Sequence, residues 1–170
     1  MLWTGFRIAF AVSALIVFTM FMSSGVGHAQ DTNAATTAPA AEDKPYKIQA
    51  DGTVDWATFS GFRRFNSECF VCHGPDGVGS TFAPALIDSL KTLTYEKFLD
   101  TVVNGKTEVN TANMKKMPSF GTNPNVMCFV DDIYAYLKAR SDGVLGRGRP
   151  DKHDPKSDEA KQAEDACMGG

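Results

Sequence analysis

The chain has 170 residues, with 17 lysine and arginine residues against 20 aspartate and glutamate residues, and a formal net charge of −3 at pH 7. This mildly acidic balance, without a basic patch, does not suit a nucleic-acid-binding protein. No internal repeat, phosphate-binding glycine loop, nucleophile–base pair or carboxylate dyad stands out, so we do not expect an enzyme.

The N-terminus has the pattern of an export signal. Arg7 precedes an apolar run from Ile8 to Met22, and small residues lead up to Ala29. This pattern predicts a signal peptide over residues 1–29, cleaved after Ala29. The alternative is a retained membrane anchor, although the run is short for a spanning helix. Residues 30–45, rich in Ala, Thr and Pro, predict a flexible leader.

The first predicted helix covers Trp56 to Glu68. Aromatic residues recur at a spacing of three along it, and Asp55 is placed to cap its N-terminus. Gly61 lies inside this helix, where glycine lowers helix stability. We therefore expect Gly61 to allow a second helix to approach closely.

The helix leads into Cys69-Phe70-Val71-Cys72-His73. Cys-x-x-Cys-His is the covalent attachment site of a c-type haem: the two thiols reach the porphyrin, and the histidine binds the iron. The alternatives are a redox dithiol or half of a zinc site. A zinc site needs four ligands, and the sequence has no second Cys-x-x-Cys and no paired histidine.

The segment after the motif predicts how His73 is oriented. The glycines of Gly74 to Gly79 allow the backbone to pass close to a porphyrin edge. The rigid stretch Ala83 to Leu86 follows, and we expect the Pro84 carbonyl to accept a hydrogen bond from the second ring nitrogen of His73. Otherwise Pro84 only stiffens the loop.

Two further helices are predicted. Thr94 caps a helix from Tyr95 to Asn104, which ends at Gly105. Asn123, followed by a proline at the first helical position, opens a last helix that reaches Arg140. We find no convincing strand pattern, so the predicted fold class is all-α.

An electron carrier also needs a ligand on the other side of the iron. Met117 is the predicted sixth ligand, because Pro118 stiffens the loop that presents its sulfur. The alternatives are Met114, His153 or an open site. Met127 falls on the last predicted helix and is expected to pack there.

The domain is expected to span residues 46–141, followed by a polar C-terminal tail over residues 142–170. Cys128 and Cys167 form an even pair in a chain expected to be exported, which predicts a disulfide that pins the tail. Closing such a loop contributes about 4 kcal/mol in the chain-entropy model. Alternatively, Cys167 is free or pairs between molecules.

The motifs occur in the order that one family shows: Gly61, Phe65, Cys69, Cys72, His73, Gly74, Pro84, Leu86, Met117, Pro118, Tyr136 and Leu137. Over residues 52–140 the chain thereby resembles class I cytochrome c. The resemblance implies helices wrapped around one covalently attached haem, with the first and last helices crossing at the glycine. It also implies His73 and Met117 as iron ligands, and Cys69, Cys72 and Pro84 as further cofactor-binding residues.

A narrower resemblance rests on Gly61 to Phe65, Gly74 to Ser80, Ala83 to Leu86, the tail segment Gly146 to His153 and the second cysteine pair. These stretches are similar to the methanol-oxidation cytochromes of methylotrophic bacteria, cytochrome c-L and the cytochromes associated with lanthanide methanol dehydrogenase. The resemblance implies a pyrroloquinoline-quinone (PQQ) alcohol or methanol dehydrogenase as electron donor. A further cytochrome or an oxidase would be the acceptor.

The predicted function is therefore one-electron transport by a single haem c in the periplasm, without stable membrane insertion after signal cleavage. A haem enzyme or gas sensor is the alternative, and it requires an open sixth position on the iron. Lys115 and Lys116, beside Met117, either meet an acidic partner or are solvated loop charges.

Overall fold

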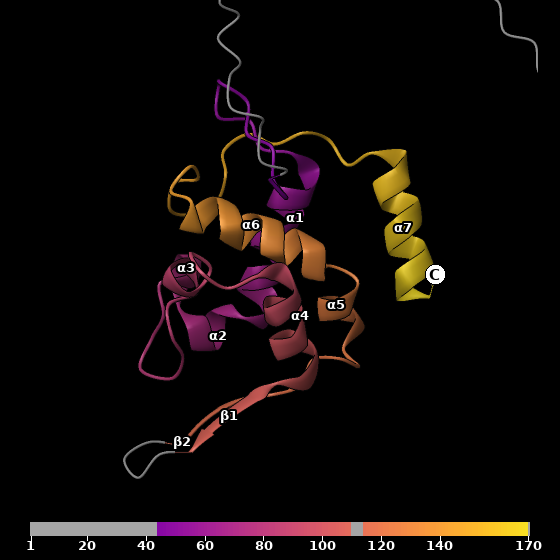
Figure 1. Ribbon diagram of the computed structural model, residues 1–170. Coiled ribbons are helices and arrows are strands. Elements are labelled where there is room, and N and C mark those ends of the chain that lie inside the picture. The colour runs from indigo at the N-terminus through magenta and orange to yellow at the C-terminus, as the bar shows by residue number, and fades with distance from the viewer. Residues whose placement is uncertain (1–43, 110–113, 170) are drawn as a thin grey trace, which may run out of the picture. The chain divides into compact units, whose positions relative to one another are not determined.

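The computed structural model describes residues 44–109 and 114–169. The predicted signal peptide and residues 30–43 of the predicted leader lie outside this part of the chain. Figure 1 shows the helical elements and one short hairpin. Their bounds are α1 Trp56–Glu68, α2 Phe70–His73, η1 (a 3₁₀ turn) Pro75–Gly77, α3 Leu86–Ser89, α4 Tyr95–Asn104, β1 Lys106–Val109, β2 Met114–Met117, α5 Pro124–Met127, α6 Val130–Ser141 and α7 Asp158–Met168.

The core forms where α6 crosses α1 (Figure 1). A Cβ atom at Gly61 would lie 1.8 Å from the backbone oxygen of Asp132, so only glycine permits this approach. Phe65 and Tyr136 are fully buried beside it, with ring centroids 5.6 Å apart. The close crossing expected at Gly61 is therefore present, and it places the end of α1 firmly against the core.

The predicted caps of α1 and α4 are confirmed. The Asp55 carboxylate accepts a hydrogen bond from the backbone N–H of Thr58, at 2.8 Å. Thr94 caps α4 in the same way, and Gly105 ends that helix with a φ of +73°. These local interactions satisfy backbone groups that a helix end leaves without partners.

The single helix predicted from Asn123 to Arg140 is wrong in one respect, because two helices cover this segment. α5 and α6 are separated at Cys128 and Phe129, and Phe129 has a φ of −133°. The Phe129 ring is buried, with the Arg64 guanidinium 3.5 Å from its centroid. The helix is thus interrupted at the residue whose ring packs against Arg64 of α1.

The predicted all-α fold class is confirmed, because the described chain is mostly helical, but it also contains two short strands that the sequence did not predict. β1 and β2 form an antiparallel hairpin in which Lys106 lies opposite Met117. The left-handed conformation of Gly105 turns the chain out of α4 and into β1. A Cβ atom at Gly105 would lie 2.6 Å from the carbonyl oxygen of Met117, so the two ends of the hairpin approach closely.

The C-terminal tail is ordered and contains α7, a helix that the sequence did not lead us to expect. Ser157 caps α7, and a disulfide joins Cys167 of α7 to Cys128, as expected for this pair. Further back, Leu145 joins the core and the His153 ring stacks on Phe59 with centroids 3.6 Å apart. Within the described ranges, no helix has the length and apolar character to cross a membrane.

Candidate functional site

The end of α1 and the short helix α2 carry the Cys-x-x-Cys-His motif. The backbone N–H of His73 donates to the carbonyl of Cys69 at 3.0 Å, so one helical turn joins the first cysteine to the histidine. Cys69 and Cys72 are free thiols, whereas Cys128 and Cys167 are paired with each other. Burial raises the pKa of Cys69 to about 12, so its sulfur is neutral, as in a thioether.

His73 is buried, with 7% of its surface exposed, and one of its ring nitrogens is already engaged. Its Nδ1–H donates to the carbonyl oxygen of Pro84 at 3.0 Å. Burial lowers the pKa of His73, against the opposing effect of this hydrogen bond, so the ring is neutral. A neutral imidazole with Nδ1 protonated has its lone pair on Nε2, the form that binds a metal ion.

The loop between His73 and Pro84 is closely packed. The backbone N–H of Gly79 donates to the His73 carbonyl at 2.7 Å, and the Ser80 hydroxyl donates to the Cys72 carbonyl at 2.5 Å. A Cβ atom at Gly79 would lie 2.7 Å from the backbone nitrogen of Ala85. The chain itself therefore fixes the distance between the histidine and the carbonyl that orients it.

Met117 ends β2, with a partly buried side chain that packs against the core. The residues after it are tied to the end of α4: Ser119 Oγ donates to the carbonyl of Val103 at 2.6 Å, and Phe120 N donates to that of Val102 at 2.9 Å. Met117 also lines a pocket of about 470 Å³ beside Gly105. The thioether is thus held in a backbone segment anchored to α4.

The other ligand candidates lie elsewhere. Met114 is the first residue of β2. His153 stacks on Phe59 and contacts the edge of Trp56, and its Nδ1 bonds to the backbone carbonyl of Asp154 at 2.8 Å. A histidine held against α1 by two aromatic rings is poorly placed to bind iron beside α2, which disfavours His153 as a ligand.

The surroundings of the motif fit a large apolar ring system. Large apolar side chains stand exposed in α2 and in the loop that follows: Phe70 (42% exposed), Val71 (79%), Val78 (38%) and Phe82 (72%). A chain usually buries such side chains. Together with two free thiols and a neutral histidine, they give the donor set and the apolar contacts that a covalently bound haem needs.

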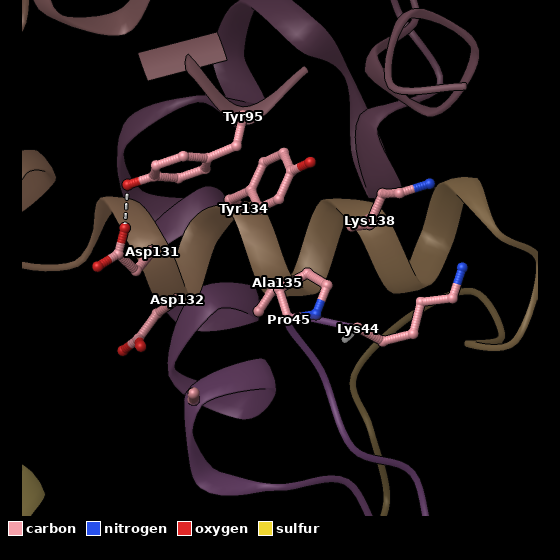
Figure 2. A pocket seen from close by; sticks show the side chains of 9 residues that line it. Lys44, Pro45, Tyr95, Asp131, Asp132, Tyr134, Ala135 and Lys138 are labelled. Carbon is pink, nitrogen blue, oxygen red and sulfur yellow. Dashed lines mark hydrogen bonds between the residues drawn. The ribbon is translucent and has the colours of Figure 1, made fainter. Parts of the chain in front are cut away.

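A second pocket, of about 500 Å³, lies on another face, between α1, α4 and α6 (Figure 2). Tyr95 there donates a short hydrogen bond to Asp131. Asp132, next along α6, is partly buried, and this burial raises its pKa to about 6 despite a hydrogen bond from Ser60. None of the predicted haem-binding residues lines this pocket.

One residue near the motif escaped sequence reasoning. Asp76, in η1, has a φ of +57°, and its side chain is 8% exposed and paired with Arg147. In the sequence, only the position of Asp76 within the glycine-rich segment from Gly74 to Gly79 pointed to this unusual backbone. Nothing in the sequence connected Asp76 with an arginine 71 positions later.

A helical fold closed by the α1–α6 crossing, with Cys-x-x-Cys-His at the end of α1, defines the c-type cytochrome class. A family model described as cytochrome C oxidase, cbb3-type, subunit III, matches residues 57–137. Cytochrome c-553I of Paracoccus denitrificans is 61% identical over 131 residues, which cover 76% of this chain and 58% of that protein. The chain thus spans less than two thirds of that relative.

Cytochrome c-555 of Methylococcus capsulatus is 38% identical over 100 residues, which cover 58% of this chain and 75% of that protein. The crystal structure of the c-type cytochrome XoxG from Methylobacterium extorquens AM1 is similar with a TM-score of 0.62 and 44% identity, over 75% of this chain and 84% of that one. The chain belongs to the c-type cytochromes, and its cofactor is covalently attached haem c. The family resemblance seen in the sequence is confirmed.

Proposed function

We propose that the protein is a one-electron carrier whose haem c is attached to Cys69 and Cys72, with His73 and Met117 as the iron ligands. The observation that carries this proposal is the buried, neutral His73, whose Nδ1–H is bound to the Pro84 carbonyl. That geometry leaves Nε2 as the donor and holds the ring in one orientation.

The residues have separate tasks in this proposal. Haem c, when bound, supplies an iron that alternates between the ferric and ferrous states. Cys69 and Cys72 hold the ring by thioether bonds, so the cofactor stays in place through each cycle. The Met117 thioether favours ferrous iron and raises the potential relative to a second histidine. Ligands on both sides leave little rearrangement when the electron arrives or leaves.

The ligand proposal is tested by optical spectra of the haem-loaded protein in both oxidation states. Met117→Leu removes the sulfur and keeps an apolar side chain of similar size. Met127→Leu, in α5, is the matched control, because Met127 is also partly buried against the core. We expect the ferric sulfur-to-iron charge-transfer band to vanish only in Met117→Leu, which should also bind carbon monoxide. A wild-type protein that lacks the band and binds carbon monoxide readily would instead favour a haem enzyme or sensor.

The electron donor that we propose is a PQQ-dependent methanol or alcohol dehydrogenase, and the acceptor is a downstream cytochrome or oxidase. The similarity of the haem loop and tail to the methanol-oxidation cytochromes supports this, as does the match to XoxG. Lys116, exposed in β2 beside Met117, offers a positive charge for a transient encounter with an acidic partner.

Stopped-flow reduction of the ferric protein by such a dehydrogenase tests the partner. We expect Lys116→Glu to slow the second-order rate at low ionic strength, and added salt to reduce the difference. Lys161→Glu on α7 is the control and should leave the rate unchanged, because Lys161 pairs with Asp158 away from the hairpin. Equal rates for the two variants would exclude the hairpin as the docking surface.

We further propose that the protein works in the periplasm after cleavage of residues 1–29. The Cys128–Cys167 disulfide supports an oxidising compartment. N-terminal sequencing of the protein from a periplasmic extract should begin at Gln30. Recovery of the chain in membranes with residues 1–29 still attached would show that the segment is a permanent anchor.

A further inference from the structure

Asp76 joins the haem loop to the C-terminal tail. Its carboxylate accepts a hydrogen bond from the backbone N–H of Gly148 at 2.9 Å and another from Arg147 Nε at 3.1 Å. Asp76 lies three positions after His73, whereas both donors come from the tail beyond α6. One nearly buried carboxylate therefore connects two segments that are far apart in the sequence.

The conformation of Asp76 fits a specific role. Among the described residues, Asp76 is the only non-glycine residue with a positive φ, which is +57°. Left-handed backbone disfavours any side chain with a Cβ, although aspartate tolerates it better than most. Glycine would fit this backbone without strain but would lack the carboxylate that receives Arg147.

Helix α6 completes the surroundings of this carboxylate. Burial raises the pKa of Tyr136, and the charge of Asp76 adds to the effect. The Tyr136 hydroxyl interacts with both the Asp76 carboxylate and Arg140. Arg140 is held in place because its guanidinium donates to the carbonyl of Leu145, where the tail begins. Asp76 thus lies among groups from α6 and from the tail.

The loop that contains Asp76 also sets the position of His73. Gly79, at the other end of that loop, donates to the His73 carbonyl and packs against the backbone of Pro84. The Pro84 carbonyl in turn accepts the Nδ1–H of His73. A shift of the loop would therefore change the distance between the ring nitrogen and its acceptor.

From these contacts we propose that the Arg147–Asp76 pair makes the tail a strap that positions the His73 ring. Asp76 and Arg147 are positioning residues: neither is a proposed iron ligand, and both act through the loop that holds the His73–Pro84 hydrogen bond. The inference rests on the proposed role of His73 as an iron ligand. It gives the tail a function in the haem site beyond that of a covalently pinned extension.

The exchange of the His73 Nδ1 proton tests this directly. In the diamagnetic ferrous protein, proton NMR in D₂O follows how fast that proton is lost. We expect Asp76→Asn and Arg147→Gln each to accelerate the exchange at least tenfold. Asparagine keeps the shape and suits the left-handed backbone, so Asp76→Asn should still fold. Lys152→Gln is the matched control: it removes the tail's ion pair with Asp51, at 3.2 Å, and leaves the haem loop alone.

The outcomes separate the two proposals. Faster exchange in both strap variants, with an unchanged rate in Lys152→Gln, supports the strap. Lower stability in the strap variants without faster exchange would overturn it, because the pair would then only fasten the tail. Equal acceleration in Lys152→Gln would also overturn it. A wild-type protein whose His73 signals show no ring-current shift from the haem would overturn the histidine ligation first, and the strap with it.

Discussion

The histidine side and the methionine side of the proposed haem site are built differently. The chain from His73 to Pro84 is short and bonded to itself at several points, and the tail reinforces it through Asp76. Met117 comes at the end of a hairpin and is held by hydrogen bonds from the following residues to the last turn of α4. In the proposed site, His73 is thus oriented by a carbonyl 11 positions away, with added support from the tail, whereas the position of Met117 depends mainly on how the hairpin packs against α4. We expect perturbations to release Met117 before His73.

Removal of the disulfide should have the largest effect on stability. Cys128 and Cys167 lie 39 positions apart, and replacing both by serine should lower the free energy of unfolding by about 4 kcal/mol. Cys128 directly follows α5, and the segment from Met117 leads into α5. Loss of the disulfide should therefore loosen Met117 and increase carbon monoxide binding, whereas the exchange rate of the His73 Nδ1 proton should stay unchanged. Denaturant titration and carbon monoxide titration measure the two effects. Faster exchange of the His73 Nδ1 proton with unchanged carbon monoxide binding would show instead that the histidine side is the less firmly held of the two.

Glycine substitutions compare the packing of the two sides. Gly79→Ala should cost about 3 kcal/mol, because it combines a φ of +85° with a contact of 2.7 Å to backbone. Gly121→Ala, on the methionine side, should cost about 1 kcal/mol, because its Cβ would meet the Val103 oxygen at 3.0 Å. Thermal or urea unfolding measures both. Similar costs would show that the two segments are equally tightly packed.

Asp132 predicts that the stability of the protein depends on pH. It lies at the α1–α6 crossing, which supports both the histidine side and the methionine side of the proposed site. Burial raises its pKa from 3.8 to about 6, so the folded state holds its proton more tightly than the unfolded chain does. Its contribution is therefore fully present below about pH 4 and is lost as the pH rises through about 6. Asp132→Asn should remove this loss and stabilise the protein by about 1 kcal/mol at pH 7, after allowance for partial exposure.

Urea unfolding of wild type and Asp132→Asn between pH 4 and pH 7 checks this prediction. The stability difference between the two proteins should grow in favour of the variant as the pH rises. A difference that stays constant over this range would show that Asp132 keeps an ordinary pKa.

Ser119→Ala should have the smallest effect. It removes the hydroxyl that donates to the carbonyl of Val103, and the site is exposed, so about 0.5 kcal/mol of stability is at stake. We nevertheless expect weaker methionine ligation, seen as faster displacement of Met117 by imidazole in stopped-flow absorbance. Ser67→Ala removes an equivalent hydroxyl bond to backbone within α1 and should leave displacement unchanged.

The features that the sequence predicted correctly depend on interactions between residues close together in the chain or on the small size of one residue. Asp55 and Thr94 cap their helices as expected, and Gly61 permits the crossing because nothing larger fits. His73 and the Pro84 carbonyl that orients it are also only 11 positions apart, in a closely packed loop.

Features that depend on long-range packing were missed. The hairpin strands are short and rich in lysine, without the alternating pattern of a strand. The break between α5 and α6 contains no glycine or proline; it coincides with the packing of the Phe129 ring against Arg64 of α1. Helix α7 has no buried residue, so its sequence has no apolar stripe from which a helix could be predicted. The contact between Asp76 and Arg147 joins segments that only the folded chain brings together.

The ligand pair of the haem iron is the central claim, and proton NMR of the ferrous protein tests it most directly. A methionine bound to haem iron has its methyl and methylene protons shifted far upfield by the ring current. We expect one such set in the wild type, unchanged in Met127→Leu and absent in Met117→Leu. A set that persists in Met117→Leu, or a wild-type spectrum without one, would contradict His73/Met117 ligation and the electron-carrier function built on it.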